Sequence, residues 1–220
     1  MTVGIKDILK SEEVRNLLDT STIQMKALGF TEHSFRHSRL VSNACGEILG
    51  QLGEDERTVE LARMAGYLHD IGNAVNRNHH SQYGAILAYD ILMRMGMACT
   101  EASMIMMAIS NHDENDGVAT DRISAALILA DKADVHRSRV TNRNRDTFDL
   151  HDRVNYAAIR SVLTVDPAAA TATLDIDIDT EISPLMDYFE IFLGRMKMCR
   201  NAAAFLGLAF RLLINGTRLL

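Results

Sequence analysis

The sequence has 220 residues, of which 47% are hydrophobic, and its formal net charge at pH 7 is −6. This length and apolar content predict one domain, with or without an added segment, around a sizeable core. The acidic balance excludes a general attraction to nucleic acid or to an anionic membrane surface.

Neither a membrane span nor a secretion signal is expected from the sequence. No apolar run is long enough to cross a bilayer, and the opening stretch MTVGIKDILKSEEV lacks a basic segment followed by an apolar one. Three cysteines without CxxC spacing are typical of reduced thiols. We therefore expect a cytoplasmic protein that does not act at a membrane.

Helical periodicity dominates residues 1–154, which we predict to form one domain. Apolar residues recur at steps of three and four over residues 32–52 and 55–70. The next two helices are expected to begin at Ser81 and Thr100, whose hydroxyls suit helix capping. The stretch DRISAALILADKADVH then carries an apolar side typical of a further buried helix.

The pattern changes in residues 155–220, which we predict to pack on the same domain. Two β-favouring runs flank Asp166 and Pro167, where proline suits a turn, so a β-hairpin is expected. Residues 174–179 alternate apolar side chains with aspartates, which favours an edge strand with an acidic, solvated face over a metal cage. From Pro184 onward the pattern predicts C-terminal helices whose apolar face packs on the main domain or forms a homodimer.

Histidine and aspartate side chains recur on the inward faces of the predicted helices or at their ends. A single inward histidine is more often a hydrogen-bonded core residue than a ligand. Several such groups on different helices need a positive charge to hold them together, and a divalent metal would supply it. The residues are His37, His69, Asp70, His80, His112 and Asp131.

The order of these residues resembles the HD-domain superfamily of metal-dependent phosphohydrolases, whose ligands follow the order H…HD…H…H…D. The resemblance covers about residues 31–139, and its matching segments are RHSRLV, AGYLHDIGN, HSQYG, AISNHDENDG and LILADKAD. It implies a mainly α, HD-domain-like helical bundle, to which the β-hairpin and C-terminal helices are added. The ligand roles that it implies are one metal ion on His37, His69 and Asp131, a second ion on His80 and His112, and Asp70 as the bridge.

The chemistry that the resemblance implies is phosphoester hydrolysis. Imidazole and carboxylate ligands suit two divalent ions of Mn, Fe, Co, Ni or Zn, and such a pair can generate hydroxide and stabilise a phosphoryl group. We expect a small anionic substrate, a nucleotide or nucleotide-like phosphoester, with Asp70 as the catalytic residue. Two alternatives are a dinuclear-iron oxygenase on the same scaffold and a nucleotide-binding regulatory protein that retains its metal.

Four further residues are candidates for substrate contacts. Many family members carry lysine where this sequence has Asn73, which can donate a hydrogen bond but brings no charge. Lys132 follows the last ligand, His33 lies one helical turn before His37, and Arg137 opens an arginine-rich stretch that could line the mouth of the site. The acidic composition makes a nucleic-acid polymer an unexpected partner.

Overall fold

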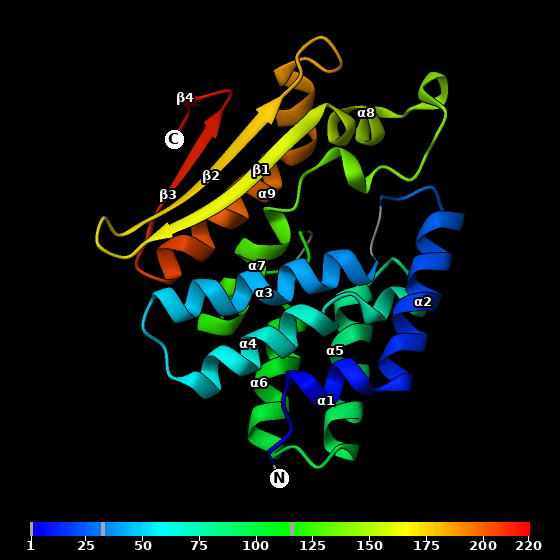
Figure 1. Ribbon diagram of the computed structural model, residues 1–220, viewed down its shortest axis with the longest axis vertical. Helices are drawn as coiled ribbons and strands as arrows, with labels where there is room; N and C mark the ends of the chain where they lie inside the picture. The colour runs from blue at the N-terminus through cyan, green and yellow to red at the C-terminus, as the bar shows by residue number, and fades with distance from the viewer. Residues whose placement is uncertain (1, 32–33, 115–116) are drawn as a thin grey trace.

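Helices make up the first two thirds of the chain, and a four-stranded sheet lies beside them (Figure 1). The structure is a computed structural model that describes residues 2–31, 34–114 and 117–220. In chain order the helices of this first part are α1 (Ile5–Lys10), α2 (Glu12–Ala27), α3 (Phe35–Gln51), α4 (Glu56–Leu68), η1 (Ile71–Ala74), α5 (His80–Arg94), α6 (Cys99–Ser110), α7 (Arg122–Lys132), η2 (Arg137–Arg139), η3 (Arg145–Thr147) and α8 (Leu150–Ala157). The mainly α fold expected from the sequence is confirmed.

Two helix starts differ from the sequence expectation by one or two residues. Helix α5 begins at His80, and the residue before it, His79, has a left-handed backbone with φ of 60°. Ser81 therefore lies inside the first turn and does not cap the helix. Helix α6 begins at Cys99, so Thr100 is also inside the helix rather than at its cap. The sharp turn into α5 leaves no trace in hydrophobic periodicity, which explains the error.

Helices α3 and α4 cross at very short range. A Cβ atom added to Gly66 of α4 would lie 2.9 Å from the Cα of Ser42 and 3.0 Å from the Sγ of Cys45, both on α3. Glycine allows this close approach because it has no side chain. The crossing brings His37 on α3 towards His69 at the end of α4.

The sheet is formed by β1 (Ala158–Asp166), β2 (Thr171–Ile178), β3 (Ala209–Ile214) and β4 (Thr217–Arg218), in that spatial order. Strands β1 and β2 form the expected antiparallel hairpin. The prediction that residues 174–179 form an edge strand is wrong, because β3 pairs with β2 in parallel on its other side. The acidic face is correct: Arg160 on β1 lies 2.7 Å from Asp175 and 3.6 Å from Asp177.

The C-terminal part contains one long helix, α9 (Leu185–Phe205), and then strands, so the prediction of further helices is wrong. Gly207 has a φ of 79°, a left-handed conformation that ends the helix. Beyond it, alternate residues Phe210, Leu212 and Ile214 are buried, as in a strand. Phe210 and Leu213 are three residues apart, which is why they also fitted a helical period.

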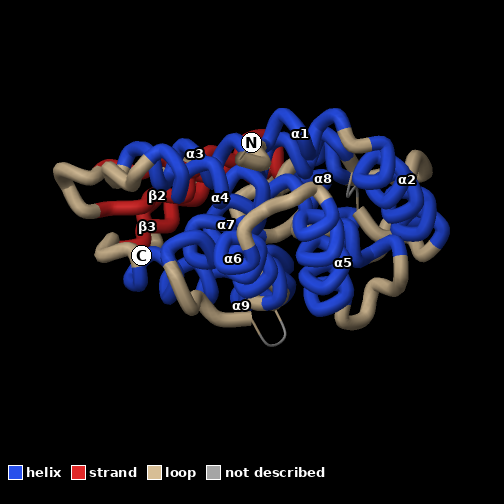
Figure 2. Tube along the Cα trace, turned by 90° about the horizontal axis from the view of Figure 1, so that it is seen from below, coloured by secondary structure: helices blue, strands red, loops and turns tan. Residues whose placement is uncertain are grey.

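Helix α9 connects the sheet to the helical bundle. It joins the parallel strands β2 and β3 and packs against both β3 and α7. Its residues Phe192, Met196 and Cys199 are buried. Figure 2 shows the strands in one half of the molecule, on the side away from α2. The C-terminal helix thus lies against α7 of the helical bundle, and the division of the chain at residue 154 and the homodimer stay predictions. Within the described ranges, every helix is too short or too polar to traverse a bilayer.

Candidate metal centre

The six residues predicted as metal ligands meet at one place in the helical bundle. They come from α3, the end of α4, the start of α5, the end of α6 and α7, and all six side chains are buried. Three groups of donor atoms in this set are close enough to hold a metal ion, each within 4.8 Å of one another. These groups are His37, His69 and Asp70; His69, His112 and Asp131; and Asp70, His80 and His112.

One half of the cluster joins His37, His69 and Asp131. Nε2 of His37 lies 3.2 Å from Nε2 of His69 and 3.2 Å from Oδ1 of Asp131. The same Oδ1 lies 3.7 Å from Nε2 of His69. In the other half, Nε2 of His80 lies 3.2 Å from Nε2 of His112.

Asp70 lies between these two halves. Its Oδ2 is 3.6 Å from Nε2 of His37 and 3.3 Å from Nε2 of His69. Its Oδ1 is 3.7 Å from Nε2 of His80. The two oxygens of one carboxylate therefore face different halves of the cluster.

The opposite ring nitrogen, Nδ1, faces an acceptor in all four histidines. A carbonyl or carboxylate oxygen only accepts, so Nδ1 carries the proton and Nε2 presents its lone pair to the cluster. Two lone pairs at 3.2 Å repel each other unless a cation or a proton lies between them. The acceptors are Asp134 Oδ2 for His37 (2.8 Å), Gly66 O for His69 (2.8 Å), Arg77 O for His80 (3.1 Å) and Ile109 O for His112 (2.6 Å).

The pKa shifts in the cluster come from burial and from the charges that the clustered groups place on one another. Burial would lower the pKa of His69, but Asp70 and Asp131 outweigh it and raise that pKa to about 10. Burial, followed by the charges of His69 and His80, holds the pKa of His112 well below its usual range. Burial opposes ionisation of Asp131, yet Lys132 and the histidines lower its pKa well below the ordinary value. The cluster thus attracts positive charge, and its imidazole and carboxylate donors fit a divalent transition metal.

The four residues predicted to contact substrate have different surroundings. Asn73 is buried and donates to Oδ1 of Asp70 at 2.8 Å and to the Asp70 carbonyl at 3.2 Å, so it orients the Asp70 carboxylate. Lys132 is buried, with Nζ 2.7 Å from Oδ2 of Asp131. The guanidinium of Arg137 lies 5.1 Å from the ring centre of Tyr156, and Arg137 is absent from the described residues that line the adjoining pocket. His33 lies outside the described residues.

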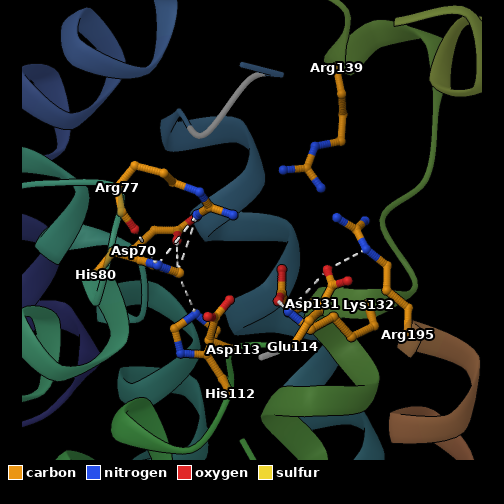
Figure 3. Close-up of a pocket in the computed structure, with 10 residues that line it drawn as sticks. All are labelled: Asp70, Arg77, His80, His112, Asp113, Glu114, Asp131, Lys132, Arg139 and Arg195. Carbon is orange, nitrogen blue, oxygen red and sulfur yellow. Dashed lines mark hydrogen bonds and ion pairs between the residues drawn. The ribbon is translucent and has the colours of Figure 1, made fainter. Parts of the chain in front are cut away.

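A pocket opens beside the cluster and contains about 290 Å³ of empty space, part of it open to solvent. Figure 3 shows its basic side chains converging from opposite sides, with Arg77 next to the histidines and Arg195 across from it. Besides the ligands Asp70, His80, His112 and Asp131, its lining is Arg77, Asp113, Glu114, Lys132, Arg139 and Arg195.

Three of the residues around the site were missed from the sequence. Asp134 follows Asp131 by three residues, and that short spacing was a usable signal for the partner of His37. Arg77 lies three residues before His80, and its Nη1 is 3.3 Å from Nε2 of that histidine. Arg195 on α9 carries no local signal, because only the fold brings it to the pocket.

Comparison with known proteins agrees with this geometry. The family model of the HD domain matches residues 34–137. Residues 34–137 form an HD domain. Five of the six predicted ligands lie between residues 69 and 131, and His37 lies near the start of the matched segment, so the whole cluster belongs to the HD domain.

Relatives of the HD domain are found in archaea and bacteria. Over 181 residues the chain is 28% identical to the uncharacterized protein MJ1020 of Methanocaldococcus jannaschii, a match that covers 71% of this chain and 68% of that protein. It is 32% identical over 101 residues to ribonuclease Y of Streptococcus pyogenes, covering 46% of this chain but only 17% of ribonuclease Y. A crystal structure of a predicted HD superfamily hydrolase from an uncultured Thermotogales bacterium aligns with a TM-score of 0.46 at 20% identity, covering 61% of this chain and 75% of that one.

Proposed function

We propose that this protein is a metal-dependent phosphohydrolase that acts on a small phosphoester, a nucleotide or nucleotide-like compound. The observation that carries the proposal is a ligand cluster bordering a pocket whose lining includes four basic side chains, Arg77, Lys132, Arg139 and Arg195. A metal-dependent hydrolase of phosphoesters uses both features, because the metal site activates water and the cations attract the phosphate.

Two divalent ions fit the donor set, with His37, His69 and Asp131 on one, His80 and His112 on the other, and Asp70 between them. When bound, such ions lower the pKa of water and stabilise negative charge on a phosphoryl oxygen. Asp70 would contribute to both metal sites, because one of its carboxylate oxygens faces each half of the cluster.

The other residues of the site prepare it for that chemistry. Asn73 fixes the Asp70 carboxylate through a hydrogen bond of 2.8 Å. Asp134 fixes the ring of His37 in the same way. Lys132 neutralises Oδ2 of Asp131 and keeps a positive charge beside the pocket. Such outer contacts hold ligands in one orientation before substrate arrives.

The similarity to ribonuclease Y supports phosphoester chemistry, since a ribonuclease cleaves phosphoester bonds in RNA. A small substrate is favoured for this chain because its net charge of −6 gives no general attraction to a polyanion. The limited volume of the pocket beside the cluster, about 290 Å³, favours the same choice.

The test is phosphate release from a panel of small phosphoesters and a short RNA, with each candidate metal added in turn. We compare the parent with Asp70→Ala and with the control Asp90→Ala, which removes an exposed carboxylate on α5. Loss of an outer contact already costs about 10–100-fold, so loss of Asp70 should reduce activity by more than about 100-fold. Absence of release with every metal, or iron-dependent oxygen consumption in its place, would contradict the proposal.

A further inference from the structure

A second, larger pocket adjoins the metal-side pocket. It contains about 800 Å³ of empty space, part of it open to solvent. Arg77 and Arg195 line both pockets, so the two are neighbours that meet at these side chains. The remaining lining comes from the loop after α2 and from α8 and its N-cap: Leu28, Gly29, Phe30, Thr31, Asp149, His151, Asp152 and Asn155.

The two pockets differ in what an anion would meet. The inner pocket has Lys132 and Arg139 in addition to the shared arginines, and two of its four carboxylates, Asp70 and Asp131, belong to the predicted metal site, whose ions would neutralise them. The outer pocket has Asp149 and Asp152 and no described basic side chain apart from His151 and the shared arginines. A phosphate is therefore favoured at the inner end, beside the predicted metal site, whereas a second anionic group deeper in the outer pocket would face carboxylates that no metal neutralises.

The polar groups of the outer pocket are suited to hydroxyl groups. Asp149 uses Oδ1 to accept from the backbone N–H of Asp152, at 2.7 Å. Asp152 uses Oδ2 to accept from Asn142, at 3.1 Å. Each carboxylate keeps its second oxygen, an acceptor that a sugar-like hydroxyl can donate to.

An aromatic side chain lies at the boundary. The Phe30 ring is 42% exposed, and the guanidinium of Arg77 lies 5.6 Å from its centre. The Phe30 carbonyl accepts a hydrogen bond of 3.1 Å from Thr141, which ties this loop to the segment after α7. Phe30 therefore offers a partly open ring face, at a fixed place, for a flat ring to stack on.

The two shared arginines can each donate hydrogen bonds to an anion. Nε of Arg195 lies 2.5 Å from Oε1 of Glu114 and its guanidinium lies 4.4 Å from the ring centre of Phe192, so this ion pair uses Nε and leaves the two Nη groups to donate. Nη1 of Arg77 contacts His80 and Asn73 at 3.3 and 3.4 Å, long distances for charged hydrogen bonds. The planar guanidinium of each side chain can thus donate two hydrogen bonds to a phosphate.

We propose that the outer pocket binds the organic half of the substrate, an uncharged, hydroxyl-bearing group with a flat ring such as a nucleoside, while Arg77 and Arg195 hold its single phosphate at the boundary. This inference rests on the proposed function, whose substrate it specifies as a monophosphate. Phe30, Asp149, Asp152 and Arg195 all lie outside residues 34–137, so substrate choice is made by parts added to the HD domain.

The test measures binding, so that it does not depend on turnover. Calorimetric titration of the metal-loaded, full-length protein compares methylphosphonate with the 5′-phosphonates of adenosine, guanosine, cytidine and uridine, which cannot be hydrolysed. At least one nucleoside phosphonate should bind about tenfold more tightly than methylphosphonate, since stacking on an aromatic ring contributes about that much.

Two variants show which side chains bind the nucleoside and which bind the phosphonate. Phe30→Ala should abolish the nucleoside advantage and leave methylphosphonate binding unchanged, and the control Phe205→Ala, an aromatic residue with 46% exposure at the end of α9, should change neither. Arg195→Gln should weaken both kinds of ligand by about tenfold.

Equal binding of methylphosphonate and all four nucleoside phosphonates would overturn the inference, as would an effect of Phe30→Ala no larger than that of Phe205→Ala. Tight binding of an RNA fragment with no binding of the single nucleoside phosphonates would also overturn it. Failure of the proposed function would be seen separately, as the absence of metal-dependent phosphate release from any phosphoester.

Discussion

The close contact between η1 and α5 sets the distance between two predicted ligands, Asp70 and His80. The substitution Gly72→Ala tests this. Gly72 lies between Asp70 and the helix that begins at His80. A Cβ atom at this position would lie 1.9 Å from the His80 carbonyl oxygen and 2.4 Å from the backbone nitrogen of Gly84. These are backbone atoms that cannot rotate away, so α5 would have to move.

We expect this overpacking to lower the free energy of unfolding by about 3 kcal/mol, the upper end for a buried insertion. For a chain of this length that corresponds to a fall of about 6–12 °C in Tm. Because α5 carries His80, the separation of 3.7 Å between its Nε2 and Oδ1 of Asp70 should widen, and metal retention should fall with stability.

Urea unfolding and elemental analysis of the same preparation measure both effects. The matched control is Gly194→Ala in α9, where an added Cβ meets nothing within 4 Å. Alanine is the better helix former, so this control should gain up to about 1 kcal/mol. An unchanged unfolding midpoint and metal content in Gly72→Ala would refute the argument that this glycine sets the distance between the ligands.

Three further outcomes follow from the geometry. Asp134→Asn removes the charge that orients His37, so the affinity for metal should fall about 10–100-fold. Competition with a chelator dye measures this affinity, and an unchanged Kd would contradict the orienting role. Asn215 has a φ of 50° and makes two hydrogen bonds, of 2.7 and 2.9 Å, to the backbone of Ile178, so Asn215→Ala should cost about 2–3 kcal/mol in urea unfolding. Asn215→Gly should cost about 1 kcal/mol less because glycine adopts this backbone freely, and equal losses would show that the conformation carries no cost. Removal of metal by a chelator should lower the Tm of the parent and leave that of Asp70→Ala unchanged.

The cluster of six predicted metal ligands was the most predictable part of the molecule. Each lies in a short segment whose neighbours are also informative, such as LHDIG around His69 and Asp70, so the sequence alone placed all six on converging helices. The structure brings their donor atoms together within the distances that metal ions require. Asp134 was also close enough in sequence to have been found.

The surroundings of the ligands were less predictable, because they depend on contacts across the fold. The sequence predicts that Asn73 contacts substrate, whereas in the folded chain its amide donates to Asp70. Arg195 reaches the pocket because α9 packs on α7, a placement that no local pattern encodes. The strand β3 was mistaken for helix because its apolar spacing fits both periods, and Gly207 was the one residue that marked the change.

The most direct test of the metal centre is elemental analysis of the protein purified without chelator, beside His80→Ala and Asp70→Ala variants whose helical content is checked by circular dichroism. We expect about two equivalents of divalent metal per chain in the parent, about one in His80→Ala and close to none in Asp70→Ala. No metal in the parent, or an undiminished content in a folded Asp70→Ala variant, would contradict this expectation.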